Sequence, residues 1–320
     1  MKVLILGGTG FIGRHAAAAL RKRGHYIVIG TRNPRRALAK LPAGLRDCEL
    51  QEIHFESLTT RYVWKPLLQD VDVVLNAVGI LRERGGETYD RVHNMAPAAL
   101  GEACARRSVR LVHVSALGLR PEARSRFLRS KLVAEKKIMA SGADYSIVRP
   151  ALLDGDGGYG AQWLRHVADW PVHFYPADAK GLMAPLDVRD LGEALATLCE
   201  RSGKDWREVE LGGGSRRTMA DYLDALRSVP EGKLAGHRAL RIPVPAPLAR
   251  LGSHICDLLH FSPYSYGHLE LMRRDNMPRS NALAALLGRA PAPVGADLPA
   301  RDSRLGVVGR LRFAARELLQ

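Results

Sequence analysis

The sequence predicts an α/β protein built on a doubly wound parallel sheet, and two observations carry this prediction. Short apolar runs alternate with longer stretches of helical periodicity out to about residue 150, and this alternation is typical of β-α-β units with parallel strands. The first apolar run ends in a glycine-rich turn that leads into an alanine-rich segment. A strand, a glycine turn and a helix in that order open sheets of this class.

The individual elements follow in a regular order along the chain. Strands are predicted at residues 3–6, 26–30, 50–55, 71–76, 109–114 and 145–148, and helices at 16–20, 64–68, 88–107 and 126–141. A later helix runs to Glu200 with Asp190 as its expected N-cap, a strand covers 208–211, and Thr218 caps the next helix. We expect a first domain at 1–155 and a small α+β cap or substrate region at 156–320, completed by chain that crosses back to the sheet.

The composition is that of an ordinary globular protein. At 46% hydrophobic and 25% charged residues, a chain of this length forms a sizeable core. No apolar run approaches the roughly 20 residues of a membrane-spanning helix, and residues 1–6 have no cleavable signal pattern, so we expect a cytoplasmic protein. The four cysteines have no CxxC spacing and the histidines no metal-ligand spacing, which favours free thiols and no metal site.

The net charge of +15 is the one unusual feature of the composition. A basic chain attracts nucleic acid, anionic lipid or acidic proteins. The basic residues are spread along the chain without a long run, and no nucleic-acid module is present, so we expect no nucleic-acid partner. An acidic protein partner, an anionic membrane surface and a genome-wide compositional bias remain the alternatives.

The opening glycine turn predicts a dinucleotide site. Gly7 lets the chain turn off the strand, Gly10 leaves room for a diphosphate beside the backbone, and Gly13 lets the following helix pack closely. The N-terminus of that helix offers free N–H groups to the phosphates. The fold is therefore expected to be of the Rossmann type. The cofactor-binding residues predicted in this turn are Gly7, Gly8, Thr9, Gly10, Phe11, Ile12 and Gly13.

The end of the second strand predicts the choice of cofactor. An acidic residue there binds the ribose 2′-hydroxyl of NAD, whereas an arginine accommodates the 2′-phosphate of NADP. Arg32 stands at this position, followed by Arg35 and Arg36, with no acid nearby in the sequence. We therefore expect NADP(H) to be preferred over NAD(H), with Arg32 and Arg36 as ligands; a solvated basic loop is the alternative.

Further cofactor contacts are expected from two later segments. The fourth strand enters a turn of small residues, Ala77, Val78 and Gly79, which lets the backbone lie against the adenine-side ribose. The helix predicted at 88–107 carries Asn94, which we also place at the cofactor.

Five motifs in order and at characteristic spacing resemble the short-chain dehydrogenase/reductase superfamily, in its extended and atypical branch. They are Gly7–Gly13, Asn76–Gly79, His113–Ser115, Ser130–Lys131 and Arg149–Pro150. The segment 126–131 with Glu135–Lys136, and the segment 271–276, are similar to the nucleotide-binding accessory subunit of respiratory complex I and its bacterial relatives. The resemblance implies that the backbone of Pro150 lies near the nicotinamide.

The resemblance also implies a catalytic set with one member missing. Active members of the superfamily use a Tyr-x-x-x-Lys pair and an upstream serine. Lys131 and Ser115 match the lysine and the serine, but the tyrosine position is Phe127, and a phenyl ring exchanges no proton.

Two interpretations follow from the missing tyrosine. In the first, the protein binds NADP(H) as a structural or sensing ligand in a respiratory or membrane-associated assembly and turns it over weakly or not at all. In the second, Lys131 itself is the acid/base, as in reductases that resemble the isoflavone reductase group, and the substrate is a hydrophobic carbonyl or enone.

The C-terminal end of the chain carries a basic amphipathic tail at about residues 300–320. Arginines alternate there with apolar residues at roughly helical spacing. Such a helix is suited to an anionic membrane surface on the inner face of the membrane, and the alternative is a helix packed on the protein itself.

Overall fold

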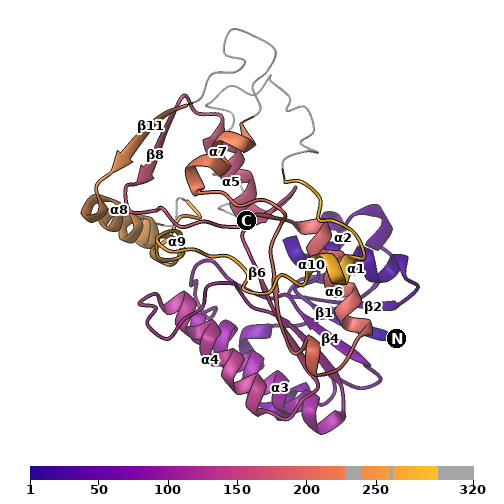
Figure 1. Ribbon diagram of the computed structural model, residues 1–320. Coiled ribbons are helices and arrows are strands. Elements are labelled where there is room, and N and C mark those ends of the chain that lie inside the picture. Colours follow the sequence, from indigo (N-terminus) through magenta and orange to yellow (C-terminus); the bar gives the residue numbers. More distant parts are fainter. Residues whose placement is uncertain (228–238, 260–261, 295–320) are drawn as a thin grey trace.

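The structure, a computed structural model, describes residues 1–227, 239–259 and 262–294. Within them a seven-stranded parallel sheet has the order β10-β6-β5-β4-β1-β2-β3 (Figure 1). The order reverses between β1 and β4, which is the switch point where α/β sheets bind ligands. The predicted fold class is confirmed. The strands are β1 (Lys2–Leu6), β2 (Tyr26–Thr31), β3 (Glu49–Glu52), β4 (Val73–Asn76), β5 (Arg110–Val114), β6 (Tyr145–Pro150) and β10 (Glu208–Leu211).

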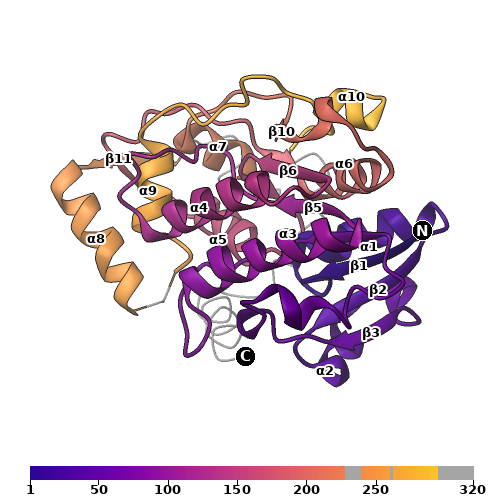
Figure 2. The same cartoon turned by 90° about the horizontal axis from the view of Figure 1, so that it is seen from below.

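Helices cover both faces of this sheet (Figures 1 and 2). One face packs against α1 (Phe11–Lys22), α6 (Val188–Glu200) and α10 (Leu283–Leu287), and the other against α3 (Ala96–Arg107) and α4 (Arg126–Ala140). Strand β1 shows the division, because Val3 and Ile5 belong to the first core and Leu4 and Leu6 to the second. Burial on both faces explains why the strands read as continuous apolar runs.

After β2 comes the short helix α2 (Pro34–Lys40), and two elements that follow it differ from the prediction. The third strand is present but shorter than predicted, and the helix expected after it is absent from the described chain. Strand β3 ends at Glu52, and Phe55 begins a 3₁₀ turn, Phe55–Ser57. The helix expected at 64–68 is a 3₁₀ turn, Arg61–Trp64, followed by further turns. The cause is burial of two rings, since Phe55 packs edge-to-face on Trp64 at 5.8 Å and the Trp64 Nε1 donates to the Leu58 carbonyl at 3.1 Å.

The long helix predicted at 88–107 consists of two parts. A π-helical turn, Arg91–Met95, precedes α3. Pro97 has no N–H to donate to the carbonyl of His93, so the regular hydrogen-bond ladder is interrupted at this point. Widened turns of this kind are frequent at functional sites.

A smaller unit follows β6, and the chain leaves the large sheet twice to build it (Figure 1). Its core joins α5 and α7 with the parallel pair of β8 and β11. Between the two excursions, α6 and β10 return to the large sheet. Thr218 caps α7 by accepting from the Asp221 N–H at 3.2 Å, as predicted. The elements are β7 (Leu153–Asp154), α5 (Tyr159–Ala168), β8 (Val172–Pro176), β9 (Leu186–Asp187), α7 (Met219–Leu226), β11 (Leu240–Val244), α8 (Ala246–Leu259) and α9 (Tyr266–Met272).

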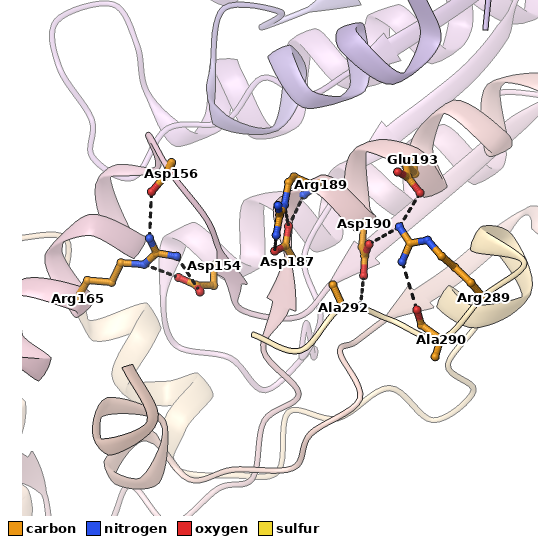
Figure 3. A network of polar contacts seen from close by, with 10 residues as sticks. All are labelled: Asp154, Asp156, Arg165, Asp187, Arg189, Asp190, Glu193, Arg289, Ala290 and Ala292. Carbon is orange, nitrogen blue, oxygen red and sulfur yellow. Dashed lines mark hydrogen bonds and ion pairs between the residues drawn. The ribbon is translucent and has the colours of Figure 1, made fainter. Parts of the chain in front are cut away.

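Polar contacts join the last segment of the described chain to α6, and a separate set of contacts lies within the smaller unit (Figure 3). Asp187, and not the predicted Asp190, is the N-cap of α6, since its Oδ1 accepts from the Arg189 N–H at 2.7 Å. Asp190 is inside the helix and binds Arg289 and the Ala292 N–H at 2.7 and 2.6 Å. Nearby, Arg165 of α5 binds both oxygens of Asp154 at 3.0 Å.

Three further observations complete the architecture. All four cysteines are free thiols, as predicted. Among the residues that the structure describes, no helix is long and apolar enough to cross a membrane, and no group of His, Cys, Asp and Glu is placed to hold a metal ion. The basic tail predicted at 300–320 lies outside the described residues.

Candidate functional site

The glycine turn has the geometry of a phosphate cradle. Gly7 has φ +72°, a left-handed conformation that favours glycine. A Cβ on Gly13 would lie 2.2 Å from the Gly7 carbonyl oxygen, so α1 begins in direct contact with the loop. A Cβ on Gly10 would meet only that same oxygen, at 3.1 Å, and Gly10 is exposed. The loop therefore leaves no room for a side chain at Gly13, whereas Gly10 faces open space.

The start of α1 is suited to an anion. Gly10 is its N-cap, and no side chain caps the first turn. Uncapped N–H groups at a helix N-terminus, together with the helix dipole, attract phosphate. The remaining loop residues have supporting positions: Gly8 is buried with its Cα beside Ile29 of β2, Ile12 packs on the core, and Thr9 is half-buried. The residues present fit a dinucleotide diphosphate.

The chain that enters the smaller unit packs against this same helix start. A Cβ on Gly158 would lie 2.7 Å from the Phe11 ring, and one on Gly157 would overlap the Arg14 guanidinium. The Arg14 Nη2 donates to the Asp156 carbonyl at 2.5 Å. Phe11 and Arg14 therefore connect the glycine loop of the large unit to the first crossing segment. The role of Arg14 was not predicted, because its partner is distant in sequence.

The predicted cofactor-selecting arginine has a carboxylate partner. Arg32 follows β2 and is 61% exposed, and its Nη1 lies 2.7 Å from the Oε1 of Glu87. The expectation that no acid competes at this position is therefore wrong. Glu87 comes from the loop between β4 and the π-helical turn, where it pairs with Arg84 in a tight reversal. Arg35 and Arg36 are exposed on α2, and the Arg36 N–H donates to the Asn33 N-cap.

The turn after β4 lies directly against the glycine loop. A Cβ on Gly7 would be 3.2 Å from the Ala77 carbonyl and from the Val78 nitrogen. Asn76, fully buried, holds the turn by accepting from the Val78 N–H at 3.1 Å. Its Nδ2 lies 3.1 Å from the Nδ1 of His113 on β5. Gly79, at the end of the turn, is exposed.

Ser115 and Pro150 stand at the ends of β5 and β6, on the same edge of the sheet. The Ser115 N–H donates to the Val148 carbonyl at 2.7 Å. Its Oγ is buried and has no hydrogen-bond partner among the described residues, which leaves it available to a ligand. Pro150 is buried, and its carbonyl accepts from the Leu117 N–H at 3.0 Å.

Lys131 extends from α4 to the turn after β4. A Cβ on Gly79 would lie 3.8 Å from the Lys131 Nζ. The lysine is only 8% exposed, and burial lowers its pKa to about 8, against an opposing effect of the Glu135 carboxylate. A pKa near neutrality makes this amine a competent proton donor or acceptor at physiological pH.

Two buried histidines next to Lys131 are held neutral. Burial lowers the pKa of His113 to about 3 and that of His93 well below its ordinary value, and the charge of Lys131 lowers both further. His93 accepts from the Ile80 N–H at 3.0 Å through its Nε2. Sequence reasoning missed both residues. His113 belongs to the motif His113–Ser115, and His93 directly precedes the predicted Asn94, but neither histidine was assigned to the site.

Phe127 occupies an aromatic cluster instead of presenting a hydroxyl. Its ring lies 5.8 Å from the Lys131 Nζ, 5.3 Å from the His93 ring and 5.7 Å from the Tyr89 ring. The hydroxyl of Tyr89 donates to the Leu81 carbonyl at 2.7 Å, so Tyr89 does not replace the missing tyrosine. Lys131 is therefore the titratable donor at this point of the site.

Asn94 lies in the π-helical turn, directly after His93 in the sequence. Its Nδ2 donates to the Asp90 Oδ1 at 2.6 Å, and its Oδ1 is buried with no hydrogen-bond partner in the described part of the chain.

The structure gathers the glycine loop, the turn at 77–79, Ser115, Lys131 and Pro150 around the carboxyl edge of β1, β4, β5 and β6. Arg32 stands at the end of the next strand, β2.

Comparison with known proteins agrees with this geometry. The sequence model of a family described as NAD(P)H-binding matches residues 7–166, half of the chain. A ceramide reductase of Caulobacter vibrioides is 26% identical over 248 residues, which is 77% of this chain and 75% of that protein. The mitochondrial NADH dehydrogenase (ubiquinone) 1 alpha subcomplex subunit 9 of Dictyostelium discoideum is 22% identical over 69% of this chain. That match spans 62% of the Dictyostelium protein, less than two thirds of its length.

Solved structures show the same fold. A nucleoside-diphosphate-sugar epimerase from Staphylococcus aureus superimposes with a TM-score of 0.70 at 16% identity, covering 92% of this chain and 98% of that one. An NADPH-dependent quinone oxidoreductase from Escherichia coli in complex with NADPH gives 0.68 at 18% identity, covering 92% and 97%.

Proposed function

The chain belongs to the NAD(P)H-binding family, as an atypical short-chain dehydrogenase/reductase with relatives among complex I accessory subunits, and we propose that it binds NADP(H) as a ligand that it turns over weakly or not at all. The proposal rests on the presence of Phe127 at the position of the catalytic tyrosine. The ring stands beside Lys131 where active members of the superfamily present a tyrosine, and it offers no proton.

The cofactor contacts in the proposal follow the geometry of the loop. The diphosphate lies at the start of α1, beside Gly10 and the N–H groups of Phe11 and Ile12. The adenosine end lies towards Arg32 and Arg36, and the nicotinamide end towards Lys131 and Pro150. Ser115 and Asn94, whose buried oxygens have no partner among the described residues, supply polar contacts. A bound nicotinamide would supply hydride chemistry.

The preference for NADP(H) over NAD(H) rests on Arg32. A guanidinium binds a phosphate through charge-assisted, often bidentate hydrogen bonds, and the exposed Arg32 swings away from Glu87 to do so. Because the Arg32 side chain is 61% exposed and that of Glu87 is partly exposed, breaking the pair costs about 1 kcal/mol. The Glu87 carboxylate thus keeps the Arg32 guanidinium close to the proposed 2′-phosphate position, and the ion pair is weak enough for the phosphate to replace Glu87.

The role in an assembly is proposed from the relatives. The similarity to a subunit of NADH dehydrogenase supports a structural or sensing role in a respiratory or membrane-associated complex, in which the nucleotide stabilises the fold by mass action. An acidic protein or an anionic membrane surface at the cytoplasmic face is the partner that a charge of +15 favours. The proposed membrane binding by the tail is tested by deleting residues 304–320 and measuring the binding of the protein to liposomes.

A second candidate function is an NADPH-dependent oxidoreductase with Lys131 as acid/base. The observation that favours it is the pKa of about 8 that burial gives Lys131, together with the neutral histidines around it. The similarity to a ceramide reductase supports a hydrophobic carbonyl compound or enone as the substrate.

The nucleotide released from the purified protein tests the proposal. The protein is unfolded and the supernatant is analysed for all four nicotinamide nucleotides. We expect NADP(H) in a ratio near one per chain. Release of NAD(H) alone contradicts the proposed preference, and a protein that neither carries nor takes up any nicotinamide nucleotide contradicts the function itself.

A further inference from the structure

Helix α8 presents three different faces. Its buried face contacts the rest of the smaller unit through Ala249 and Ser253. A second stripe, Arg250, His254 and Asp257 at helical spacing, lines a cavity. The third face is exposed and wholly apolar. Its residues are Leu248 (59% exposed), Leu251 (58%), Ile255 (42%), Leu258 (78%) and Leu259 (62%).

The neighbouring two-stranded sheet also carries exposed apolar side chains. Phe174 of β8 is 62% exposed and stands opposite Ile242 of β11, which is 36% exposed, in the parallel register of the pair. Strand β11 leads directly into α8 at the periphery of the smaller unit (Figure 1). Exposed large apolar side chains gathered on one helix mark an interaction surface.

The cavity next to α8 has a volume of about 460 Å³ and an excess of positive charge. It is lined by α8, the start of α9, the start of α4 with Phe127, and the loop after β4 with Tyr89. Two of its four arginines are neutralised: Arg82 pairs with Asp257 at 3.3 Å and Arg126 with Glu83 at 3.0 Å.

The guanidinium groups of the other two arginines, Arg124 and Arg250, form no ion pair with a carboxylate among the described residues, and the Arg124 backbone N–H donates to the Glu270 carboxylate at 2.9 Å. Arg250 instead lies over the Tyr266 ring at 5.6 Å, which holds the guanidinium at the cavity wall. A pair of unneutralised guanidinium groups in a concave site is suited to a phosphate.

We propose that α8 lies in the surface of an anionic bilayer, with its apolar stripe among the acyl chains and a lipid phosphate headgroup bound between Arg124 and Arg250. The inference rests on α8, because this one helix carries both an apolar stripe for lipid tails and a stripe that lines an arginine-containing cavity for the headgroup. The apolar stripe is next to the cavity-lining stripe, so a lipid whose tail lies along the first places its headgroup at the second. It deepens the proposed function by naming the membrane contact, and it does not depend on the tail at 300–320.

Charge complementarity selects the bilayer over a second copy of this chain. A second copy carries the same net charge of +15 and brings two arginine-lined cavities towards each other. An anionic membrane attracts the same surface over a Debye length and complements both arginines.

The test is flotation of the full chain with vesicles of phosphatidylcholine alone or of equal parts phosphatidylcholine and phosphatidylglycerol. We expect strong binding to the mixed vesicles and weak binding to the neutral ones. Leu251→Glu with Leu258→Glu is expected to abolish both. Arg124→Gln with Arg250→Gln is expected to weaken only the binding to mixed vesicles, by about fivefold for each arginine removed. Leu38→Glu, at an exposed leucine of α2, is the matched control and binds like the unmodified protein.

Three outcomes overturn the inference. The first is vesicle binding that survives the double glutamate variant, which places the anchor elsewhere. The second is an arginine variant that binds as the unmodified protein does. The third is a concentration-dependent dimer that the glutamate variant dissociates in the absence of vesicles. All variants are expected to retain NADPH, so a protein that binds vesicles but no nucleotide refutes the proposed function alone.

Discussion

The guanidinium of Arg32 and the carboxylate of Glu87 form an ion pair at the end of β2, with Nη1 and Oε1 2.7 Å apart. The same guanidinium is the group expected to bind the 2′-phosphate of NADP. Glu87 therefore has two effects on the cofactor. It positions Arg32 beside the adenosine end of the site, and its negative charge competes with the phosphate for the same donor.

Substitution of either partner is expected to change cofactor choice in opposite directions. Arg32→Asp weakens NADPH binding by about 2–3 kcal/mol, because a charge-assisted hydrogen bond is lost, and leaves NADH affinity nearly unchanged. Glu87→Gln strengthens NADPH binding by about 0.5–1 kcal/mol, since a competing, partly exposed ion pair is removed. Both are measured by fluorescence titration. Arg107→Asp, an exposed arginine at the end of α3, is the control, and unchanged NADPH affinity in Arg32→Asp refutes the account of selection.

Two glycines of the first loop are expected to respond differently to alanine. The Cβ of Gly13→Ala meets the Gly7 carbonyl oxygen at 2.2 Å, and a backbone oxygen cannot move aside as a flexible side chain can. We expect a loss of about 2–3 kcal/mol in the free energy of unfolding, measured in urea. Gly44→Ala, with no atom within 4 Å of the new Cβ, serves as the control and stays near the unmodified value.

Gly10→Ala is expected to fold normally and to lose nucleotide. Its Cβ meets only the Gly7 oxygen at 3.1 Å, but it projects where the diphosphate approaches the backbone. Overpacking of about 1–3 kcal/mol at this point corresponds to roughly 5- to 150-fold in NADPH affinity. Equal affinity in Gly10→Ala and the unmodified protein contradicts the placement of the diphosphate.

Phe127→Tyr is expected to raise NADPH-dependent reduction of a carbonyl substrate above the rate of the unmodified protein. The new hydroxyl stands on a ring 5.8 Å from the Lys131 Nζ, whose charge lowers the pKa of a neighbouring phenol. Rates are followed by the absorbance of NADPH over a panel of quinones, aldehydes and enones. Phe127→Leu is the control for a repacked aromatic cluster, and a tyrosine variant no faster than the leucine variant shows that the missing hydroxyl is not what limits turnover.

The lowered pKa of Lys131 predicts a pH-dependent stability. Between about pH 8 and the ordinary lysine pKa of 10.5, the unfolded chain holds a proton that the folded chain has released, so stability rises with pH through this window. Lys131→Met removes this gain. The free energy of unfolding of the unmodified protein, minus that of Lys131→Met, is therefore expected to increase from pH 8 to 10, and a difference that is flat or falls shows that Lys131 is not buried as described. The thiols of Cys104 and Cys199, whose pKa burial raises to about 12, titrate identically in both proteins.

The sequence sufficed to predict the parts of the fold that local chemistry decides. Apolar runs placed the strands of the large sheet within a residue or two, except that the end of β3 was predicted three residues too late. The glycine pattern located the loop, because Gly7 needs a left-handed backbone and Gly13 permits no Cβ. The N-cap of α6 shows the limit of local reasoning. Asp187 and Asp190 are both suitable caps, and the contact of Asp190 with Arg289 decided between them.

What escaped prediction depends on residues distant in sequence. Glu87 reaches Arg32 from a separate loop, and Trp64 is buried against Phe55 in turns where a helix was expected. His93 and His113 became recognisable only when the sheet brought both beside Lys131. The three faces of α8 follow the helical periodicity, but which of them is exposed depends on how the smaller unit packs.

The most direct test of the central claim is single-turnover oxidation of bound NADPH. The purified protein is loaded with one equivalent of NADPH, mixed with each of a panel of quinones and enones, and followed by absorbance, with Lys131→Ala in parallel. We predict that NADPH stays bound and reduced with every acceptor. Acceptor-dependent oxidation that disappears in Lys131→Ala contradicts it, and identifies the protein as an enzyme that uses Lys131 in spite of Phe127.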